Sequence, residues 1–516
     1  MEQVSSTSTN NKRIAKNAVF LYIRMALSTL VSLYTSRVVL QTLGVEDFGI
    51  YSLVGGVVVM FQFLNSSLSG ATSRFLTFEL GKGDVQRLKD TFSTAMMAHL
   101  LMAAFVFIVA ETVGLWFIST QLVIPEGRMF AAQIVYQCSI LSLMVSFTQV
   151  PYNASIISHE DMGVFAYIEL LSVFLRLGIV FLLMIGSFDK LILYAVLVLS
   201  VSITIALIYR IYAIRHYEEC HFHFIWKPKI LRPMLAFSGW NIYTYASGSI
   251  RQVGINAFIN IFCGIIYNAA SGIATTVLGA LTNFSNNVIT AFRPQIIKQY
   301  AQGNMSSMVK LMINASKYSM ILFLALSLPI FFELPYILRL WLVVVPDKTV
   351  EFIRILLVSV IPFTLYDVII IGIHASGNIK AISIILGTLN LLLFIPSYFL
   401  LYLGFNVESV YYCFLVFRCI NLIAVFIVLK KQMPEFPLKL LIKEVTLNLF
   451  FISSIVICLI FFINSNYVES FSRFIVSCCI SFILYGLYTF YFVIDKSTRA
   501  RLRTKINNYV KVKLRK

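Results

Sequence analysis

The sequence has few charged residues and very few acidic ones. Lys, Arg, Asp and Glu make up 12% of its 516 residues, and only 23 residues are Asp or Glu. A soluble domain has about 25% charged residues, whereas 59% of this chain is hydrophobic. This composition excludes a soluble protein and indicates a chain that lies in a lipid bilayer. No polar stretch is long enough to form a large soluble domain.

The sequence also lacks the short motifs of nucleotide binding and hydrolysis. Walker A, GxSxG and HExxH motifs are absent, as is GxGxxG after a strand, so the chain has none of the usual means of hydrolysing ATP. A membrane polysaccharide polymerase is the main enzymatic alternative, but acidic residues on the outer loops are scattered and form no catalytic pair. The His-rich segment 216–223 has no closed zinc spacing. We expect no catalytic residue, cofactor or metal.

Long hydrophobic segments dominate the chain. A bilayer-spanning helix needs about 20 apolar residues, and hydropathy predicts about fourteen such helices. The first is too long for the core of a signal peptide. We therefore predict an all-α polytopic membrane protein. The predicted spans are 17–43, 48–70, 91–118, 130–150, 163–186, 189–213, 233–262, 265–291, 311–335, 350–373, 380–404, 409–429, 441–463 and 471–494.

Lys and Arg residues concentrate in alternate loops. The side of the membrane that holds the N-terminus carries 30 of them, and the opposite side carries 6. Because cytoplasmic loops are enriched in Lys and Arg, both termini are predicted to be cytoplasmic and the number of spans to be even. The basic residues follow the loops and do not form one patch, so the net charge of +18 does not indicate a nucleic-acid partner.

The first half of the chain faintly repeats 220 residues later. Six spans separate the two copies, so both enter the membrane in the same direction, and an axis along the membrane normal relates them. We predict a six-helix lobe over residues 1–230, a second over 231–435, and an extra helix pair with a basic tail over 436–516. Internal repeats of this kind are typical of secondary transporters, in which the substrate site lies between the lobes. The matching residues are Gly44 and Gly264, Asn65 to Ser67 and Ser285 to Asn287, Ala71 and Ala291, and Gly83-Asp84 and Gly303-Asn304.

Polar side chains recur at helical spacing in the first span of each predicted lobe. Intramembrane charges are costly and so suggest function, which makes Arg24 and Arg251 candidates for an anion site. Arg37 lies nearer the outer end of its span, and Arg418 suits either a cavity or a helix contact. The neutral residues of these two stripes, predicted to line a hydrophilic cavity, are Ser28 and Ser32 in the first lobe and Asn241, Gln252 and Asn256 in the second.

Two further groups of polar residues lie within the spans. Asp367 and His374 are seven residues apart, on one helix face, and are candidates for ion coupling because carboxylate and His chains relay protons in pumps. Glu111 is a third candidate. The second helices of the two lobes carry Asn65 and Ser66, and Asn286, respectively. These neutral groups suit either helix packing or contacts to sugar hydroxyls.

The segment 17–84, with SRVVLQTLGVEDFGIYSLVGG and SSLSGATSRFLTFELGKGD, resembles the Wzx-type polysaccharide flippases of the MATE/MOP exporter superfamily. The resemblance implies alternating access, in which two lobes carry an undecaprenyl-diphosphate-linked oligosaccharide across the bacterial inner membrane. Such units serve O-antigen (lipopolysaccharide) or capsule synthesis. The resemblance implies cationic cavity residues at Arg24 and Arg251, with Arg37 as a third. The planar guanidinium group of arginine suits a diphosphate.

The resemblance also implies partners and rival functions. The expected partners are the lipid-linked oligosaccharide, membrane lipids, and the polysaccharide polymerase with its chain-length machinery. The rivals are a MATE-type cation-coupled drug antiporter, a lipid II flippase and, in another class, the polymerase itself. The cavity spans contain more Arg than carboxylate, which favours an anionic substrate over the cationic drugs of the antiporters.

Overall fold

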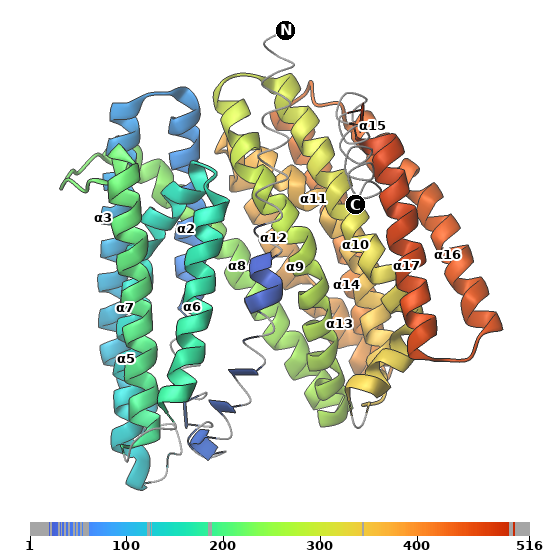
Figure 1. The fold of residues 1–516 in the computed structure, drawn as a ribbon, viewed down its shortest axis with the longest axis horizontal. Helices are drawn as coiled ribbons and strands as arrows, with labels where there is room; N and C mark the ends of the chain where they lie inside the picture. Colours follow the sequence, from blue (N-terminus) through green and yellow to red (C-terminus); the bar gives the residue numbers. More distant parts are fainter. Residues whose placement is uncertain are drawn as a thin grey trace, which may run out of the picture.

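A computed structural model describes most of the chain after residue 60. The described residues are 61–120, 124, 126–183, 188–342, 345–494 and 499–500, together with residues 20, 23–28, 31, 34, 35, 38, 39, 42–44, 47, 50, 51 and 54. Arg37 and Ser32 therefore lie outside the described residues. Within these ranges the regular structure is helical throughout, with no strand. Figure 1 shows two groups of long helices that stand side by side.

The first group contains five long helices among the described residues. Helix α5 packs against α7, α2 and α3, and α6 packs against α7. The elements are α2 (Gln62–Lys82), α3 (Val85–Val109), a π-helical segment (Ala110–Gly114), α4 (Leu115–Thr120), α5 (Met129–Ser158), α6 (Met162–Leu182) and α7 (Lys190–His216).

The second group follows a short 3₁₀ turn, Glu218–Cys220. Its centre is α11, which packs against α9, α10 and α14, while α8 packs against α12 and α13. The elements are α8 (Pro228–Cys263), α9 (Ile265–Ala301), α10 (Met305–Trp341), α11 (Thr349–Ser376), α12 (Lys380–Leu392), α13 (Phe394–Tyr402) and α14 (Glu408–Gln432).

An extra pair of helices packs against α10 at the edge of the second group (Figure 1). Lys317 of α10 pairs with Glu444 at one end of this pair, and Arg473 pairs with the buried Glu333 at the other end, at 2.7 Å. The elements are α15 (Leu438–Leu441), a π-helical segment (Ile442–Leu447), α16 (Asn448–Asn466), α17 (Phe471–Tyr488) and a second π-helical segment (Thr489–Val493).

The helix caps reproduce the internal repeat. Gly83, after α2, and Gly303, after α9, have φ of 77° and 74°, a left-handed conformation that glycine adopts without strain. The next residue then caps the following helix: Asp84 accepts a hydrogen bond from the backbone N–H three residues on at 2.9 Å, and Asn304 does so at 3.2 Å. The predicted 220-residue repeat therefore has a structural counterpart, the same turn and cap in each lobe.

The predicted all-helical architecture of two lobes and an extra helix pair is confirmed, while the exact lobe boundaries stay predictions. Ten helices of the described residues are long and apolar enough to cross a membrane. The more polar helices α2, α8 and α9 run beside them over 21 to 37 residues, and the total agrees with about fourteen spans.

The predicted spans 48–70 and 265–291 end too early. The structure leaves only two residues between α2 and α3 and three between α9 and α10, because the helices continue beyond their apolar stretches. Arg74 follows the predicted span 48–70, yet it lies inside α2 and is 8% exposed. A span predicted from hydropathy ends at the first charged residue. The helix itself continues when a residue of another helix bonds to that charged side chain.

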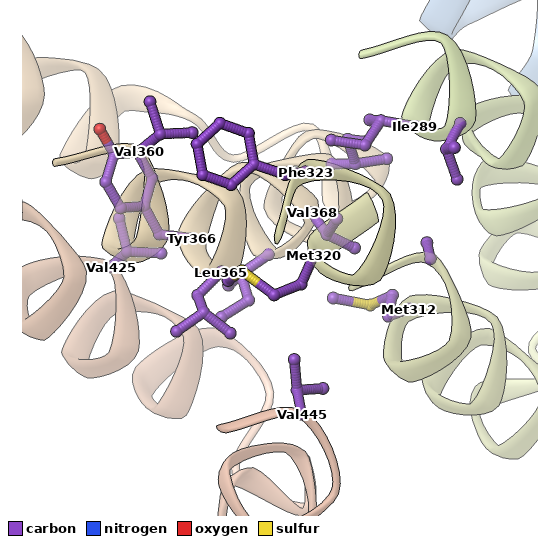
Figure 2. Close-up of a cluster of buried hydrophobic side chains, with 14 of the residues drawn as sticks. Ile289, Met312, Met320, Phe323, Val360, Leu365, Tyr366, Val368, Val425 and Val445 are labelled. Atoms are coloured by element: carbon purple, nitrogen blue, oxygen red, sulfur yellow. The ribbon is translucent and has the colours of Figure 1, made fainter. Parts of the chain in front are cut away.

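The core of the second lobe is continuous from α9 to α14 and reaches the extra helix pair. Figure 2 shows Phe323 of α10 beside Val360 and Val368 of α11, with Val425 of α14 and Val445 nearby. Burial of such side chains is worth about 1.5–3 kcal/mol each when the reference is water. In a bilayer the same close packing holds the helices together through van der Waals contact.

Candidate functional site in the second lobe

A cavity of about 230 Å³ lies inside the second lobe. Helices α8, α9, α11 and α14 line it, together with the break between α12 and α13. The sequence analysis predicted three of its residues as site residues: Arg251, Gln252 and Asn256. The other lining residues are Ile255, Ser271, Thr275, Leu278, Gly279, Thr282, Leu356, Leu393, Val410, Tyr411, Phe414 and Arg418.

Two arginines meet in this cavity, one from α8 and one from α14. The guanidinium carbons of Arg251 and Arg418 lie 4.7 and 4.8 Å from the centre of the same ring, Phe414. The Arg418 guanidinium also lies 4.4 Å from the centre of the Phe363 ring and donates a hydrogen bond to the Tyr366 hydroxyl. Aromatic faces attract cations, so these rings hold both guanidinium groups beside one cavity.

The lining of the cavity is cationic and rich in neutral hydrogen-bonding groups. It contains two arginines and no Asp or Glu. Ser271 donates a hydrogen bond to the Asn256 side-chain oxygen at 2.9 Å, which fixes that amide at the cavity wall. Gln252 is exposed. A permanently positive pair surrounded by hydroxyl and amide groups can bind an anion that also carries hydroxyls.

Asp367 lies near this cavity but does not line it. Arg418 and Arg293 both act electrostatically on its carboxyl group. Arg293 also acts on His374, whose ring packs edge-on at 5.3 Å against Phe237. The structure thus places Asp367 and His374 along one face of α11 with a shared cationic neighbour, Arg293. Their role in ion coupling stays a prediction.

Arg24 belongs to the predicted first lobe and contacts other helices of that lobe. Its guanidinium carbon lies 4.9 Å from the centre of the Phe165 ring of α6, and it acts electrostatically on Tyr209 of α7. The Tyr209 hydroxyl donates a hydrogen bond to Glu169 at 2.9 Å. Arg24 therefore has a carboxylate, Glu169, in its surroundings. The predicted third arginine, Arg37, lies outside the described residues.

Glu111 is partly buried in the π-helical segment after α3. One of its carboxylate oxygens accepts a hydrogen bond from Gln137 at 3.2 Å. The other is buried, and no hydrogen-bond donor among the described residues reaches it. A π-helical turn often marks a functional position, and sequence periodicity gave no sign of it. Its proposed role in ion coupling remains untested by this geometry.

The remaining predicted lining residues have different surroundings. Asn65 donates a hydrogen bond to Ser146 of α5 at 2.9 Å, which is a contact within the first lobe. Ser66 bonds the carbonyl four residues earlier, at 3.1 Å. Asn241 is buried and faces Gly70 of α2 across the two lobes. Ser28 is half-buried and Asn286 is exposed, while Ser32 lies outside the described residues.

The two lobes meet at the end that carries the basic loops. Arg74 of α2 reaches the end of α11, where its Nε and Nη2 atoms donate to the carbonyl groups of His374 and Ala375 at 3.0 and 2.9 Å. The loop residue Glu160 accepts from Gln295 at 2.6 Å and from Lys298 at 2.8 Å. These contacts close the molecule at this end, and the ribbons of the two lobes diverge towards the opposite end (Figure 1).

Arg74 and Glu160 were not predicted as functional residues, because the partners of each lie far away in the sequence. The partners of Arg74 are 300 and 301 residues away. One signal was available for Glu160: it follows His159 in a segment of mixed charge between two spans. Within the described ranges, no group of three or more His, Cys, Asp or Glu side chains gathers as a metal site.

Comparisons with known proteins identify the fold. No family model matches the sequence, and no curated protein matches it. Solved structures do match. An outward-facing multidrug resistance MATE family transporter of the MOP superfamily superposes with a TM-score of 0.71 at 15% identity, covering 83% of this chain and 97% of that one. The chain has the fold of a MATE transporter.

Two further structures with the MATE fold are informative. A MATE protein in a bent conformation gives a TM-score of 0.70 at 15% identity, with 83% of this chain and 96% of that chain covered. A MOP superfamily transporter from Pyrococcus furiosus gives 0.69 at 15% identity and the same coverage. That protein is described as having a binding pocket of reverse polarity that suggests a different function. At these identities the likeness establishes the MATE fold of a multi-pass membrane protein.

Proposed function

We propose that this protein is a flippase for undecaprenyl-diphosphate-linked oligosaccharide repeat units, acting by alternating access in surface polysaccharide synthesis. The observation that carries the proposal is the cavity of the second lobe, which has two arginines and no carboxylate in its lining. A cationic drug would meet like charge in this cavity. A diphosphate, which cannot cross hydrocarbon unaided, would meet planar, permanently charged donors.

The resemblance of segment 17–84 to the Wzx-type flippases supports the same proposal. The MOP superfamily includes the Pyrococcus furiosus transporter whose reversed pocket polarity is taken to suggest a different function, so within this fold the charge of the pocket can distinguish substrates. In our proposal Arg251 contacts the diphosphate, and Arg24 and Arg37 contact it from the first lobe. Asn65, Ser66, Asn241, Gln252 and Asn256 are then available to the sugar hydroxyls.

The proposal includes a location and partners. The protein would lie in the bacterial inner membrane with both termini in the cytoplasm, as the loop charges predict. It would receive the lipid-linked unit at the cytoplasmic leaflet and release it on the outer side to the polymerase and its chain-length machinery. Loading occurs only when the lobes separate at the end closed by Glu160 and Lys298.

Deletion of the gene tests the proposal. We expect lipid-linked repeat units to accumulate in the cytoplasmic leaflet, where an added membrane-impermeant glycosidase cannot cleave them. Wild-type protein should restore surface polysaccharide, and Arg251→Ala at equal expression should not. A matched control is Arg354→Ala in the same lobe, since Arg354 donates to the Phe331 carbonyl at 3.2 Å and does not line the cavity.

Three other results would contradict the proposal. Ion-coupled drug efflux with normal surface polysaccharide in the deletion strain would establish the antiporter. Loss of growth through lipid II trapped in the inner leaflet would establish a lipid II flippase. Altered chain length without trapped repeat units would establish the polymerase.

A further inference from the structure

The second arginine of the cavity, Arg418, is not explained by helix packing alone. Its Nε atom is buried, as is the Nε atom of Arg251, and neither has an acceptor among the described residues. The two guanidinium groups also lie against the same Phe414 ring, at 4.7 and 4.8 Å from its centre, so their like charges repel each other. The cavity therefore combines two unsatisfied cationic donors at one wall.

An arrangement of this kind is costly in a membrane protein without a ligand. A buried charged donor without an acceptor loses the full free energy of its hydration. Two like charges in a poorly polarisable environment add mutual repulsion. An anion between them would remove both costs at once, because it accepts hydrogen bonds from both guanidinium groups and neutralises their charge.

The cavity is larger than a simple anion requires. One water molecule occupies about 30 Å³, so a cavity of about 230 Å³ has room for a sugar-sized group besides the anion. The lining also includes the hydroxyl groups of Ser271 and Thr275 and the amide of Asn256. These groups match the hydroxyls of a sugar ring.

We propose that this cavity binds an oxyanion carried on a sugar-sized group, and that Arg251 and Arg418 hold the oxyanion together. The oxyanion is either a phosphate joined to a sugar, as the sugar-proximal phosphate of the proposed diphosphate is, or the carboxylate of an acidic sugar, since a planar guanidinium can donate two hydrogen bonds to either. The nature of the natural ligand rests on the proposed function, in which the transported unit would carry this group. The binding site itself rests on the cavity.

Calorimetric titration of the purified full-length protein tests the site. The probes are glucuronate, glucose 6-phosphate and uncharged glucose. We expect the wild type to bind at least one of the two anions and not glucose. Arg251→Gln and Arg418→Gln should each weaken binding about 10- to 100-fold, the effect of losing a charge-assisted hydrogen bond. The preferred anion distinguishes a carboxylate from a phosphate as the group recognised.

Two controls separate binding from folding. Arg354→Gln should bind as the wild type does, because its arginine bonds a backbone carbonyl outside the cavity. Arg418→Lys keeps the charge but loses the planar fork, so binding should lie between that of wild type and Arg418→Gln, while the thermal midpoint without ligand stays close to wild type. This variant keeps the test decisive even when Arg418→Gln does not fold.

The inference is overturned when the wild type binds neither anion, binds glucose equally well, or when Arg354→Gln weakens binding as much as Arg418→Gln does. Its failure differs from failure of the proposed function. Anion binding without trapped repeat units in the deletion strain would retain the site and remove the flippase. Trapped units with a wild type that binds no anion would retain the flippase and remove the site.

Discussion

Glu160 of the first lobe and Lys298 of the second lobe form an ion pair of 2.8 Å at the end that carries the basic loops. The Glu160 side chain is 1% exposed and the Lys298 side chain is 17% exposed. Breaking a buried pair by removing one partner costs about 3–5 kcal/mol. Because the pair joins the two lobes, that cost applies only to conformations in which this end is closed.

The first prediction is that Glu160→Gln opens this end of the molecule. The variant removes the charged partner of Lys298 but keeps the size of the side chain, so the closed conformation becomes less stable relative to the open one. Spin labels at the exposed positions 82 and 302, at the ends of α2 and α9, should report longer distances. Unchanged distances would show that the pair does not hold the lobes together.

Lys89→Gln is the matched control for this measurement. Lys89 pairs with Glu218 at 3.0 Å at the same end of the molecule, but both residues precede the second lobe. The pair is also more exposed, and exposed pairs contribute about 0–1 kcal/mol. The control should leave the label distances unchanged.

The second prediction concerns the anchor of the extra helix pair. Arg473 donates to Glu333 at 2.7 and 3.2 Å and to the Tyr467 carbonyl at 2.8 Å. Arg473→Ala leaves the fully buried Glu333 carboxylate without this partner, so we expect a loss of about 3–5 kcal/mol, seen as a lower thermal unfolding midpoint in detergent. The double variant Arg473→Met with Glu333→Leu should recover most of it, because no charge is then left unpaired. A double variant as unstable as Arg473→Ala would contradict this account.

The third prediction is that Gly377→Ala weakens the contact between α2 and α11. Gly377 has φ of 82°, and an added Cβ would lie 2.6 Å from the Nη2 atom of Arg74. The left-handed backbone alone costs a residue other than Gly about 1–2 kcal/mol, and displacing Arg74 adds the loss of its bonds to two carbonyls. Thermal unfolding should show the loss. Gly404 has φ of 80° and open space where a Cβ would lie. Gly404→Ala should therefore lose only the stability that the left-handed backbone costs.

The fourth prediction concerns the opposite end of the first lobe at low pH. Burial opposes the charge of Asp189, but the backbone N–H groups of Ile192 and Leu191 and the guanidinium of Arg128 outweigh it and lower the pKa of this carboxyl below its ordinary value. The stabilising effect is therefore present at neutral pH and is lost as the pH falls through the folded-state pKa, below about 3.9.

Asp189→Asn separates this charge effect from the helix cap. Asn caps a helix about as well as Asp, so the variant should lose only the ion pair with Arg128, about 0.2–1 kcal/mol at neutral pH. The difference in unfolding free energy between wild type and variant should shrink as the pH approaches 3. A difference that stays constant with pH would show that the Asp189 charge contributes nothing.

Much of the fold could be predicted from the sequence because lipid imposes simple rules. A spanning helix must be long and apolar, and the basic loops must alternate, so the number of spans and the lobes follow from hydropathy and charge. The repeat of Gly83-Asp84 at Gly303-Asn304 was readable because a turn with positive φ and a helix cap both require particular residue types. The ends of α2 and α9 could not be predicted, since their charged residues are bonded by residues outside these helices.

The candidate site was predictable only in part. Asn256 was a candidate because it lies on a polar stripe of one helix, and Arg251 was a candidate because it is an intramembrane charge beside that stripe. The proximity of Arg251 to Arg418 could not be predicted from the sequence, because it depends on how α8 and α14 pack around Phe414. Arg24 is the predicted counterpart of Arg251 in the first lobe. Its guanidinium lies beside Phe165 and Tyr209, and its contact with a diphosphate stays a prediction.

The attachment of the extra helix pair has a practical consequence for following motion. Its bonds to α10, through Lys317 with Glu444 and Arg473 with Glu333, tie it to the second lobe at both ends. A fluorophore on this pair would therefore travel with the second lobe. Paired with a second dye on the exposed end of α7 in the first lobe, it would record each opening and closing as a change in energy-transfer efficiency, with the dyes far from the cavity.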